Sequence, residues 1–505
     1  MSRRPLLQVA AALLLLAAGT LLVLRSSPPE HKEMFLSEGC ALSVHLFEPH
    51  EQPALGSVLL FHGLAGTEKV MDYYTRGFLA LGLRVVVPDL PGHGASPGPF
   101  SASRAEACSE ALFTALVRRG EIVPARTLLA GHSLGGAIAL RLGARNAVAG
   151  VVALSPAPML AAPGVSPEVL FYPPPMKLPP HSLLVSGAFE PVALLRSSEL
   201  LFVQRAGLFS EIRVVPAASH VSLLLDAAAL RLSLDWTSRV LALPALAALP
   251  DRSNFLGFLL GLCGLALLSG TLLRAALPSF PRAPAPKVSA SPAPARGILE
   301  MAAASFFAVG LLKFGVPLRF LGLCNGDYLA SFLLLVGLAL LLLHARRFRP
   351  LLRLPLPIAA RAAALACALC LLFFAWFHFT ITSAWLDAAR LWRFPLLILA
   401  LFPFFAAEEY LLGPVVASTQ ALRLRRLAHG LAARLAAWLP LYLALFYLHN
   451  AQVLLVLLAP YFALFSALQR WGVDRFEEQT RCPAGAALFG AILATVFGLL
   501  LFPLT

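Results

Sequence analysis

Long apolar runs constrain the fold of this chain more than any other feature of its sequence. One run covers residues 5–24, and eight more follow at 254–273, 298–323, 328–344, 362–383, 395–415, 435–449, 450–468 and 484–504. Runs of this length are typical of helices that cross a bilayer. With 59% hydrophobic and 13% charged residues, the chain is also too apolar for a soluble protein. We therefore expect a multi-pass membrane protein with nine spans, or eight if the two runs that meet at Asn450 form one broken segment.

The first apolar run has two interpretations, a transmembrane anchor and a signal peptide. Arg3 and Arg4 precede it, as basic residues precede both kinds of segment. Its apolar part is long, and no clear small-x-small cleavage site follows it. These features favour an uncleaved anchor over residues 1–27, with a cleaved signal peptide as the alternative.

Basic residues gather in alternate loops between the runs. The net charge is +14, but this distribution follows the positive-inside rule and gives no reason to expect a nucleic acid partner. It predicts a cytoplasmic N-terminus, with the residues after the anchor and the C-terminus outside. A composition rich in Ala, Arg, Leu and Pro points to a bacterial inner membrane, whose anionic headgroups the basic loops can contact. The clusters are Arg274, Arg282, Lys287 and Arg296; Arg346, Arg347, Arg349, Arg353 and Arg361; Arg423, Arg425, Arg426 and Arg434; and Arg470, Arg475 and Arg481.

Residues 28–250 have the pattern of a globular domain. Short apolar runs at 57–61, 84–88, 127–130, 151–154, 182–185 and 211–215 alternate there with helix-like segments. Buried strands separated by helices predict a mostly parallel sheet of the α/β class. Ligands of such sheets bind at the carboxyl ends of the strands. Residues 251–505 are expected to form an all-α transmembrane domain with a Pro/Ala-rich loop at 276–297.

Polar and glycine-rich motifs follow five of the six expected strands. His-Gly-Leu-Ala-Gly begins at His62 after the first strand, and Asp-x-x-Gly-His-Gly-x-Ser occupies 89–96 after the second. Gly-His-Ser-Leu-Gly at 131–135 follows the third strand, Glu190 closes a turn after the fifth, and His220 comes after the sixth. A serine on a sharp strand-to-helix turn has its hydroxyl clear of the backbone, so it can act as a nucleophile.

These five motifs, in this order, resemble the α/β-hydrolases, in the branch of monoacylglycerol lipases, lysophospholipases and serine aminopeptidases. The resemblance covers nearly half of the chain. It implies a catalytic triad with Ser133 as the nucleophile, His220 as the base and Glu190 as the acid. It also implies an oxyanion hole made by the backbone N–H groups of Leu64 and Leu134. It implies no metal ion and no other cofactor.

Two departures from the family pattern concern the acid and the cap. The family usually has an aspartate where this chain has Glu190, so the turn must accommodate one more methylene. Family members usually carry a helical cap between the fourth and fifth strands, but here residues 156–180 are rich in proline and too few for several helices. We expect a short or absent cap and an open site, or one covered by a loop. Phe171 and Tyr172 of that loop are the expected substrate contacts, close to the lipid surface.

Other polar residues near the motifs have structural interpretations. His62 and His93 are expected to be hydrogen-bonding residues of their loops rather than bases. His132, inside the serine turn, is expected to face the fold beside the nucleophile. Ser96 and Ser155 are interpreted as turn residues.

The cysteines give a weaker signal. Cys40 and Cys108 are the cysteines of the globular region. A bridge between them is possible in an oxidising compartment, but two cysteines in a domain of this size are more often unpaired. Cys367 and Cys370 have the spacing of a redox pair, yet they lie inside an apolar run, so we interpret them as packing residues.

Two adjacent carboxylates lie inside one of the membrane runs. Glu408 and Glu409 are costly there and suggest a function, with His378 and His449 as candidate partners. The pair faintly resembles the CAAX-type glutamic intramembrane proteases. However, Gly413 stands where that family has an arginine, and His378 precedes the glutamates instead of following them. The alternative is that both glutamates pair with nearby basic or histidine side chains or lie near the interface.

The sequence therefore predicts a membrane-anchored serine hydrolase that cleaves an acyl ester of a lipid or small molecule. Peptidase activity is the alternative reaction at the same site. Membrane lipids are the other expected partners. A hypothesis of another class is a transporter or channel-like protein whose hydrolase-like domain is a binding module.

Overall fold

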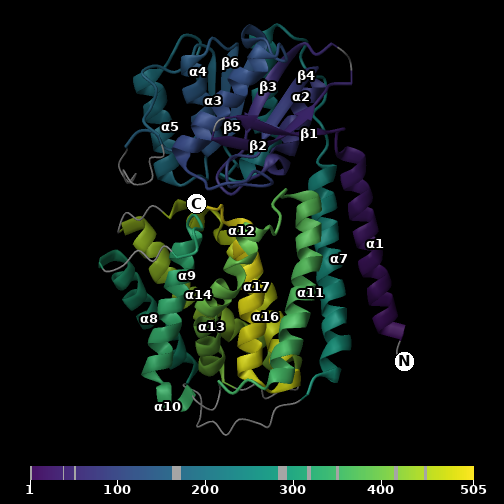
Figure 1. Cartoon of the computed structure of the whole chain (residues 1–505), viewed down its shortest axis with the longest axis vertical. Helices are drawn as coiled ribbons and strands as arrows, with labels where there is room; N and C mark the ends of the chain where they lie inside the picture. The colour runs from purple at the N-terminus through teal and green to yellow at the C-terminus, as the bar shows by residue number, and fades with distance from the viewer. Residues whose placement is uncertain are drawn as a thin grey trace.

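The chain folds into two stacked parts, an α/β domain and a bundle of long helices (Figure 1). The computed structural model describes residues 3–37, 39–50, 53–161, 172–281, 293–314, 320–348, 352–413, 419–447 and 452–505. The N-terminal helix α1 (Arg3–Ser26) runs along the bundle and leads into the α/β domain. The chain returns to the bundle through α7 (Ser253–Ala276), which packs along α1.

The α/β domain is built on one eight-stranded sheet with the order β1-β2-β4-β3-β5-β6-β7-β8. Strands β3 to β8 are parallel, and β1 and β2 form an antiparallel edge that the sequence patterns did not predict. The strands are β1 (His31–Ser37), β2 (Cys40–Phe47), β3 (Gly56–Phe61), β4 (Leu83–Pro88), β5 (Thr127–His132), β6 (Gly150–Leu154), β7 (Ser182–Gly187) and β8 (Glu211–Val215).

Helices cover both faces of this sheet, which is why its central strands are apolar on both sides. One core includes Leu59 of β3 and Leu112 of a helix, and the other includes Leu60 of β3 and Phe78 of another helix. The prediction of a mostly parallel α/β domain is confirmed. Its helices are α2 (Asp72–Ala80), α3 (Ala102–Arg118), α4 (Leu134–Arg145), α5 (Val192–Arg205) and α6 (Ala227–Leu241).

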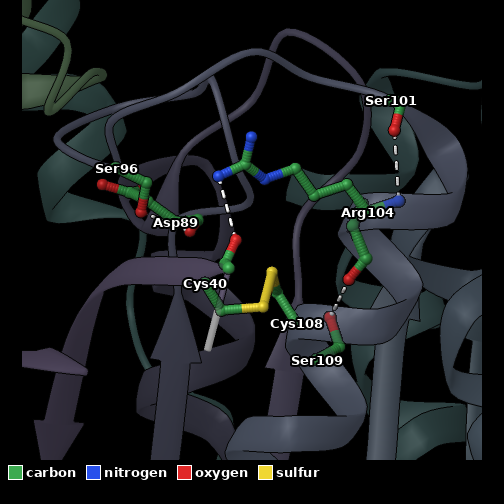
Figure 2. The surroundings of a disulfide bond; sticks show 9 residues. Cys40, Asp89, Ser96, Ser101, Arg104, Cys108 and Ser109 are labelled. Carbon is green, nitrogen blue, oxygen red and sulfur yellow. Dashed lines mark hydrogen bonds between the residues drawn. A yellow bond between two sulfur atoms is a disulfide. The ribbon is translucent and has the colours of Figure 1, made fainter. Parts of the chain in front are cut away.

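A disulfide joins Cys40 at the start of β2 to Cys108 of α3, with Cα atoms 5.4 Å apart (Figure 2). It fastens the antiparallel edge of the sheet to the helix layer. Arg104 of α3 adds a hydrogen bond from its Nη2 to the carbonyl oxygen of Gly39, 2.9 Å away. These two cysteines are therefore paired, although two such cysteines are more often unpaired, because α3 packs against β2 and brings the two distant segments into contact.

Within its described residues, the helical part contains eight helices that are long and apolar enough to cross a membrane. These are α1, α7, α8 (Pro294–Phe314), α9 (Gly326–Leu343), α11 (Leu356–Thr380), α13 (Arg393–Leu412), α14 (Gln420–Tyr447) and α17 (Pro483–Leu501). Close contacts of small residues hold some of them together. A Cβ added to Gly19 of α1 would lie 2.6 Å from the carbonyl oxygen of Gly257 in α7.

One further long helix, α16 (Ala459–Thr480), runs through the bundle in contact with α14 and α17 but is less apolar. Because α16 is one more crossing of the bundle, the C-terminus lies at the α/β domain. There the carbonyl oxygen of Leu504 accepts the N–H of Phe100 at 2.5 Å. The expected span at 450–468 is replaced by a short helix, α15 (Val453–Leu457), and α16. The expected basic loops near Arg426 and Arg470 are instead parts of α14 and α16, and both arginines pair there with the buried Glu409.

Candidate active site

Ser133 occupies a strained turn between β5 and α4, with φ 54° and ψ −116°. The glycines around it are required by close backbone approach. A Cβ on Gly131 would lie 2.4 Å from the backbone of Gly135, and one on Gly135 would lie 2.2 Å from the carbonyl oxygen of Phe61. The Gly-x-Ser-x-Gly pattern thus lets α4 start directly against the sheet. The serine at its tip is half-buried and sits at the first residue before the helix.

His220 and Glu190 approach each other from the loops after β8 and β7. Nδ1 of His220 lies 3.7 Å from Oε2 of Glu190, and both residues are buried. Within the described part of the chain, neither ring nitrogen of His220 nor Oε2 of Glu190 has a hydrogen-bond partner. A buried polar atom without a partner costs about 1–3 kcal/mol, so such atoms need an explanation. Catalytic hydrogen bonds are often long in ligand-free enzymes and shorten when substrate binds.

The other oxygen of Glu190 is firmly held. Oε1 accepts the backbone N–H of Gly187 at 2.7 Å and also the hydroxyl of Ser155. Ser155 follows β6 with a φ of 42° and is buried. Sequence reasoning took it for a turn residue and missed this contact, because nothing in the chain links positions 155 and 190 before the strands align. Glu190 is therefore oriented with one oxygen fixed and the other facing His220.

His132 supports the histidine loop instead of titrating. Its Nε2 bonds the carbonyl oxygen of His220 at 2.9 Å, and the two rings lie 4.7 Å apart. Burial, reinforced by the nearby His220, lowers the pKa of His132 to about 3. The ring is therefore neutral at physiological pH, with its proton on Nε2. This position agrees with its expected place beside the nucleophile.

The loop after β3 contains Leu64, whose backbone N–H is one of the two predicted oxyanion-hole donors. The carbonyl oxygen of Gly63 contacts Nδ1 of His62 at 2.8 Å and accepts the N–H of Gly66 at 2.9 Å. Because N–H and C=O point in opposite directions across a trans peptide, this carbonyl directs the N–H of Leu64 the other way. The N–H of Leu64 has no acceptor among the described residues. The N–H of Leu134, at the first turn of α4, also lacks an intrahelical acceptor.

His62 and His93 are structural, as expected. Nε2 of His62 accepts the N–H of Leu90 at 2.9 Å, which leaves the ring neutral with its proton on Nδ1. Burial lowers the pKa of His62 and, with the neighbouring His62 ring, lowers the pKa of His93 to about 3. Ser96 donates its hydroxyl to the carbonyl of Asp89 and accepts the N–H of Ser43.

Of the two expected substrate contacts of the short loop, Tyr172 does not line the cavity that contains Ser133. Phe171 lies outside the described residues. Tyr172 is buried against α3, where its hydroxyl donates to the carbonyl oxygen of Ala102 at 2.7 Å. Arg141 lies over its ring. The structure gives Tyr172 a packing role, because its hydroxyl finds a partner on the helix layer and its ring does not line the cavity that contains Ser133.

A cavity of about 1400 Å³ contains Ser133, His220 and Glu190 together with the Leu64 and Leu134 backbone. Its opposite wall is not a cap of the α/β domain but the helical bundle. The two parts are joined beside the oxyanion loop. Asp89 accepts the hydroxyl of Ser383 at 2.7 Å, Thr67 donates to the carbonyl oxygen of Ile381 at 3.2 Å, and Lys69 donates to that of Phe379 at 3.1 Å. The expected open or loop-covered site is in fact faced by membrane-type helices.

One group of metal-ligand atoms occurs in the described part of the chain. His45, Glu68 and Asp89 bring such atoms within 4.8 Å of one another. Hydrogen bonds already engage this group, since Nδ1 of His45 meets Glu30 at 2.5 Å. Burial opposes a charge on His45, but hydrogen bonds to Asp89 and Glu30 raise its pKa to about 9. Burial, with the nearby charge of Asp89, raises the pKa of Glu68 to about 8. His45 is thus a buried cation between carboxylates.

Glu408 and Glu409 lie on α13 and pair with arginines. Nε and Nη2 of Arg434 donate to Glu408 at 2.6 and 2.9 Å. Arg470 donates to Glu408 at 3.0 Å and also to Glu409, whose other oxygen accepts Nη2 of Arg426 at 3.1 Å. The interpretation of these glutamates as ion-pair partners therefore describes the structure. Of the two candidate histidine partners, His378 instead bonds the carbonyl oxygen of Ala384, and His449 lies outside the described residues.

Comparison with known proteins agrees with this fold. Residues 52–189 match the model of the family of serine aminopeptidases, S33. This match and the order of the strands agree with the α/β-hydrolase fold predicted for the globular domain. A serine hydrolase homologue from Coxiella burnetii is 18% identical, with coverage of 42% of this chain and 96% of that chain and a TM-score of 0.34. A predicted hydrolase from Thermoplasma acidophilum is 20% identical, with 42% and 99% coverage and a TM-score of 0.34. Esterase 2 of Thermogutta terrifontis is 14% identical, with 44% and 97% coverage and a TM-score of 0.36. Comparison with curated protein sequences gave no match.

Proposed function

We propose that this chain is a membrane-anchored serine hydrolase that cleaves acyl esters with Ser133, His220 and Glu190. One observation carries the proposal. A serine with a positive φ shares a cavity with a buried histidine whose two ring nitrogens have no partner among the described residues. The free oxygen of Glu190 faces that histidine. Such an arrangement leaves the atoms that must transfer a proton available, and it matches the order serine, acid, histidine of α/β-hydrolases.

The proposed reaction proceeds in two balanced steps. Oγ of Ser133 attacks the acyl carbon while His220 takes the hydroxyl proton, and the N–H groups of Leu64 and Leu134 stabilise the negative oxygen. The bond from the acyl carbon to the alcohol oxygen then breaks, and His220 gives its proton to the leaving alcohol. A water molecule next gives a proton to His220 and adds to the acyl carbon. The bond from the acyl carbon to Oγ then breaks while His220 gives its proton to Oγ, which releases the carboxylic acid and restores Ser133 and His220.

We further propose that the reaction takes place at the outer face of a bacterial inner membrane. The α/β domain and the C-terminus lie at one end of the bundle, and the basic segment that contains Arg346 and Arg347 lies at the other end (Figure 1). Basic segments stay in the cytoplasm. The disulfide of Cys40 and Cys108 supports the same orientation, because such bonds persist in oxidising compartments.

The nucleophile is tested by labelling the purified full-length protein with a fluorophosphonate. We expect the parent to be labelled and to hydrolyse p-nitrophenyl butyrate, and Ser133→Ala to lose labelling and about 10⁶-fold of its turnover. Ser96→Ala is a matched control at another buried serine, and it should keep the labelling. Undiminished hydrolysis by a well-folded Ser133→Ala protein rules out this serine.

The orientation is tested with a reporter that is active only in the cytoplasm. Fused after Asp251, beside the α/β domain, it should be silent; fused after Arg347, at the far end of the bundle, it should be active. The physical reason is the high cost of moving arginine-rich segments across the bilayer. A bright fusion at Asp251 places the hydrolase domain in the cytoplasm instead.

A further inference from the structure

The membrane half has no role in the reaction proposed so far, although an anchor needs far fewer helices. We propose that this half forms the acyl-chain site of the enzyme and that the substrate is a long-chain lipid ester taken from the bilayer. The inference rests on the proposed function, because it places the acyl carbon at Ser133. The chain attached to that carbon lies in an apolar groove of the bundle.

The groove is continuous with the candidate active site. The cavity that contains Ser133 extends between α7, α11, α16 and α17, which lie beneath the α/β domain (Figure 1). Phe258, Leu262, Phe373 and Leu493 are among its lining residues. An ester bond at the serine thus has a direct apolar path away from the α/β domain and into the bundle.

The polarity of the lining changes along this path. Near Ser133 the wall includes charged residues such as Lys69, Asp72 and Arg252. Below them, the lining residues that α7, α11, α16 and α17 contribute carry no charged side chain. Gln469, a polar exception, is already engaged, because its amide donates to the carbonyl oxygen of Gly490 at 2.6 Å. A polar mouth above an apolar channel matches a lipid ester, with its head group above and its chain below.

The length of the groove also fits an acyl chain. Leu501, near the upper end of α17, and Phe489 both line it. They lie roughly 18 Å apart along the helix at about 1.5 Å per residue. The hydrocarbon core of a bilayer is about 30 Å thick, so the chains of one leaflet reach about 15 Å. A full-length lipid chain therefore fits, whereas a butyryl group reaches only the upper part.

Large apolar side chains of the groove are uncovered in the protein itself. Leu259 of α7 is 39% exposed, and Leu464 and Leu468 of α16 are 53% and 41% exposed. All three line the groove. In a bilayer such side chains face lipid chains and not water, so the groove is open to an acyl chain that comes from the membrane. Continuity with the serine selects the acyl chain of the substrate as that occupant.

Gly472 offers a way to block the groove without touching the catalytic residues. It lines the groove about 20 Å along α16 from Ala459, at about 1.5 Å per residue. A Cβ added there would meet only Phe489, 3.6 Å away. Gly472→Leu therefore places a side chain in the channel with little strain on the backbone. Gly310→Leu in α8 is the matched control, since a Cβ there meets nothing within 4 Å and the residue does not line the groove.

The experiment compares p-nitrophenyl esters from butyryl to palmitoyl, which share one leaving group. We expect the parent to prefer long acyl chains and Gly472→Leu to lower kcat/KM for the palmitoyl ester at least tenfold, because several buried methylenes lose their site. Its kcat/KM for the butyryl ester should stay within about twofold, and Gly310→Leu should match the parent on both esters. Retained butyrate hydrolysis also shows that the variant is folded.

The two proposals fail in different ways. If the parent hydrolyses no ester and takes no fluorophosphonate label, the proposed function is wrong. If the parent hydrolyses butyrate but Gly472→Leu leaves the palmitoyl-to-butyryl ratio unchanged, or lowers both activities equally, the acyl chain does not lie in this groove. An alcohol chain in the groove gives that second result, because the series varies only the acyl part.

Discussion

Two of the buried groups of titratable side chains in the described part of the chain differ in how completely they are paired. In the α/β domain, the ring nitrogens of His220 and one oxygen of Glu190 have no hydrogen-bond partner in the described chain. In the helical bundle, all four carboxylate oxygens of Glu408 and Glu409 accept hydrogen bonds from arginines. Both groups are almost fully removed from solvent.

This difference separates a group that is available for chemistry from one that holds helices together. A base must have a free lone pair close to the proton that it takes, and a cavity must bring the substrate there. His220 meets both conditions, since it lines the large cavity beside Ser133. The oxygens of Glu408 and Glu409 are saturated by arginines. A buried carboxylate in a membrane helix is therefore a weaker sign of catalysis than an unpaired one facing a cavity.

The largest effect in this comparison is expected from Glu190→Gln, which keeps the shape of the turn but removes the charge that faces His220. The imidazolium formed in the reaction then loses its counter-charge, and the ring loses its orientation. By the behaviour of such triads, we expect kcat to fall by about 10²–10⁴-fold with little change in KM. Steady-state kinetics with p-nitrophenyl butyrate measure both constants.

Ser155→Ala is the graded control for this prediction, because it removes one hydrogen bond to the same carboxylate and leaves its charge. Its kcat should fall by about tenfold, the value of one hydrogen bond to a charged group. If Glu190→Gln is nearly as active as the parent, the acid of the triad lies elsewhere and Glu190 only closes its turn.

The parts of this structure that local patterns encode could be predicted from the sequence. The strands that precede Ser133, Glu190 and His220 are short apolar runs bounded by turns. The alternation of strand and helix could therefore be predicted from the sequence. The parallel sheet then brings the ends of its strands to one edge, which is why three residues far apart in sequence meet at one cavity.

The parts that depend on contacts between distant segments could not be predicted in this way. Arg470 looked like a residue of a cytoplasmic loop, since an isolated charge is costly in a bilayer. Only the packing of α16 against α13 supplies the carboxylates that make its burial tolerable. The pairing of Cys40 with Cys108 and the contact of Ser155 with Glu190 have the same origin. The bundle wall of the cavity that contains Ser133 likewise has no signature in the linear sequence.

Arg470→Met tests the ion-pair group of Glu408 and Glu409. Methionine has a similar length to arginine but carries no charge. It leaves Glu408 and Glu409 with less compensation in a buried site, which typically costs about 3–5 kcal/mol of stability. We expect a lower Tm and yield in detergent, while the molecules that remain folded take the fluorophosphonate label at the parental rate.

The double variant Arg470→Met with Glu409→Gln should recover part of the lost Tm, because the two sites share one interaction. An unchanged Tm shows that the pairing contributes no net stability. If a folded Arg470→Met protein is labelled slowly, the arginine affects the chemistry at Ser133. That result contradicts the view that the group in the bundle only holds helices together.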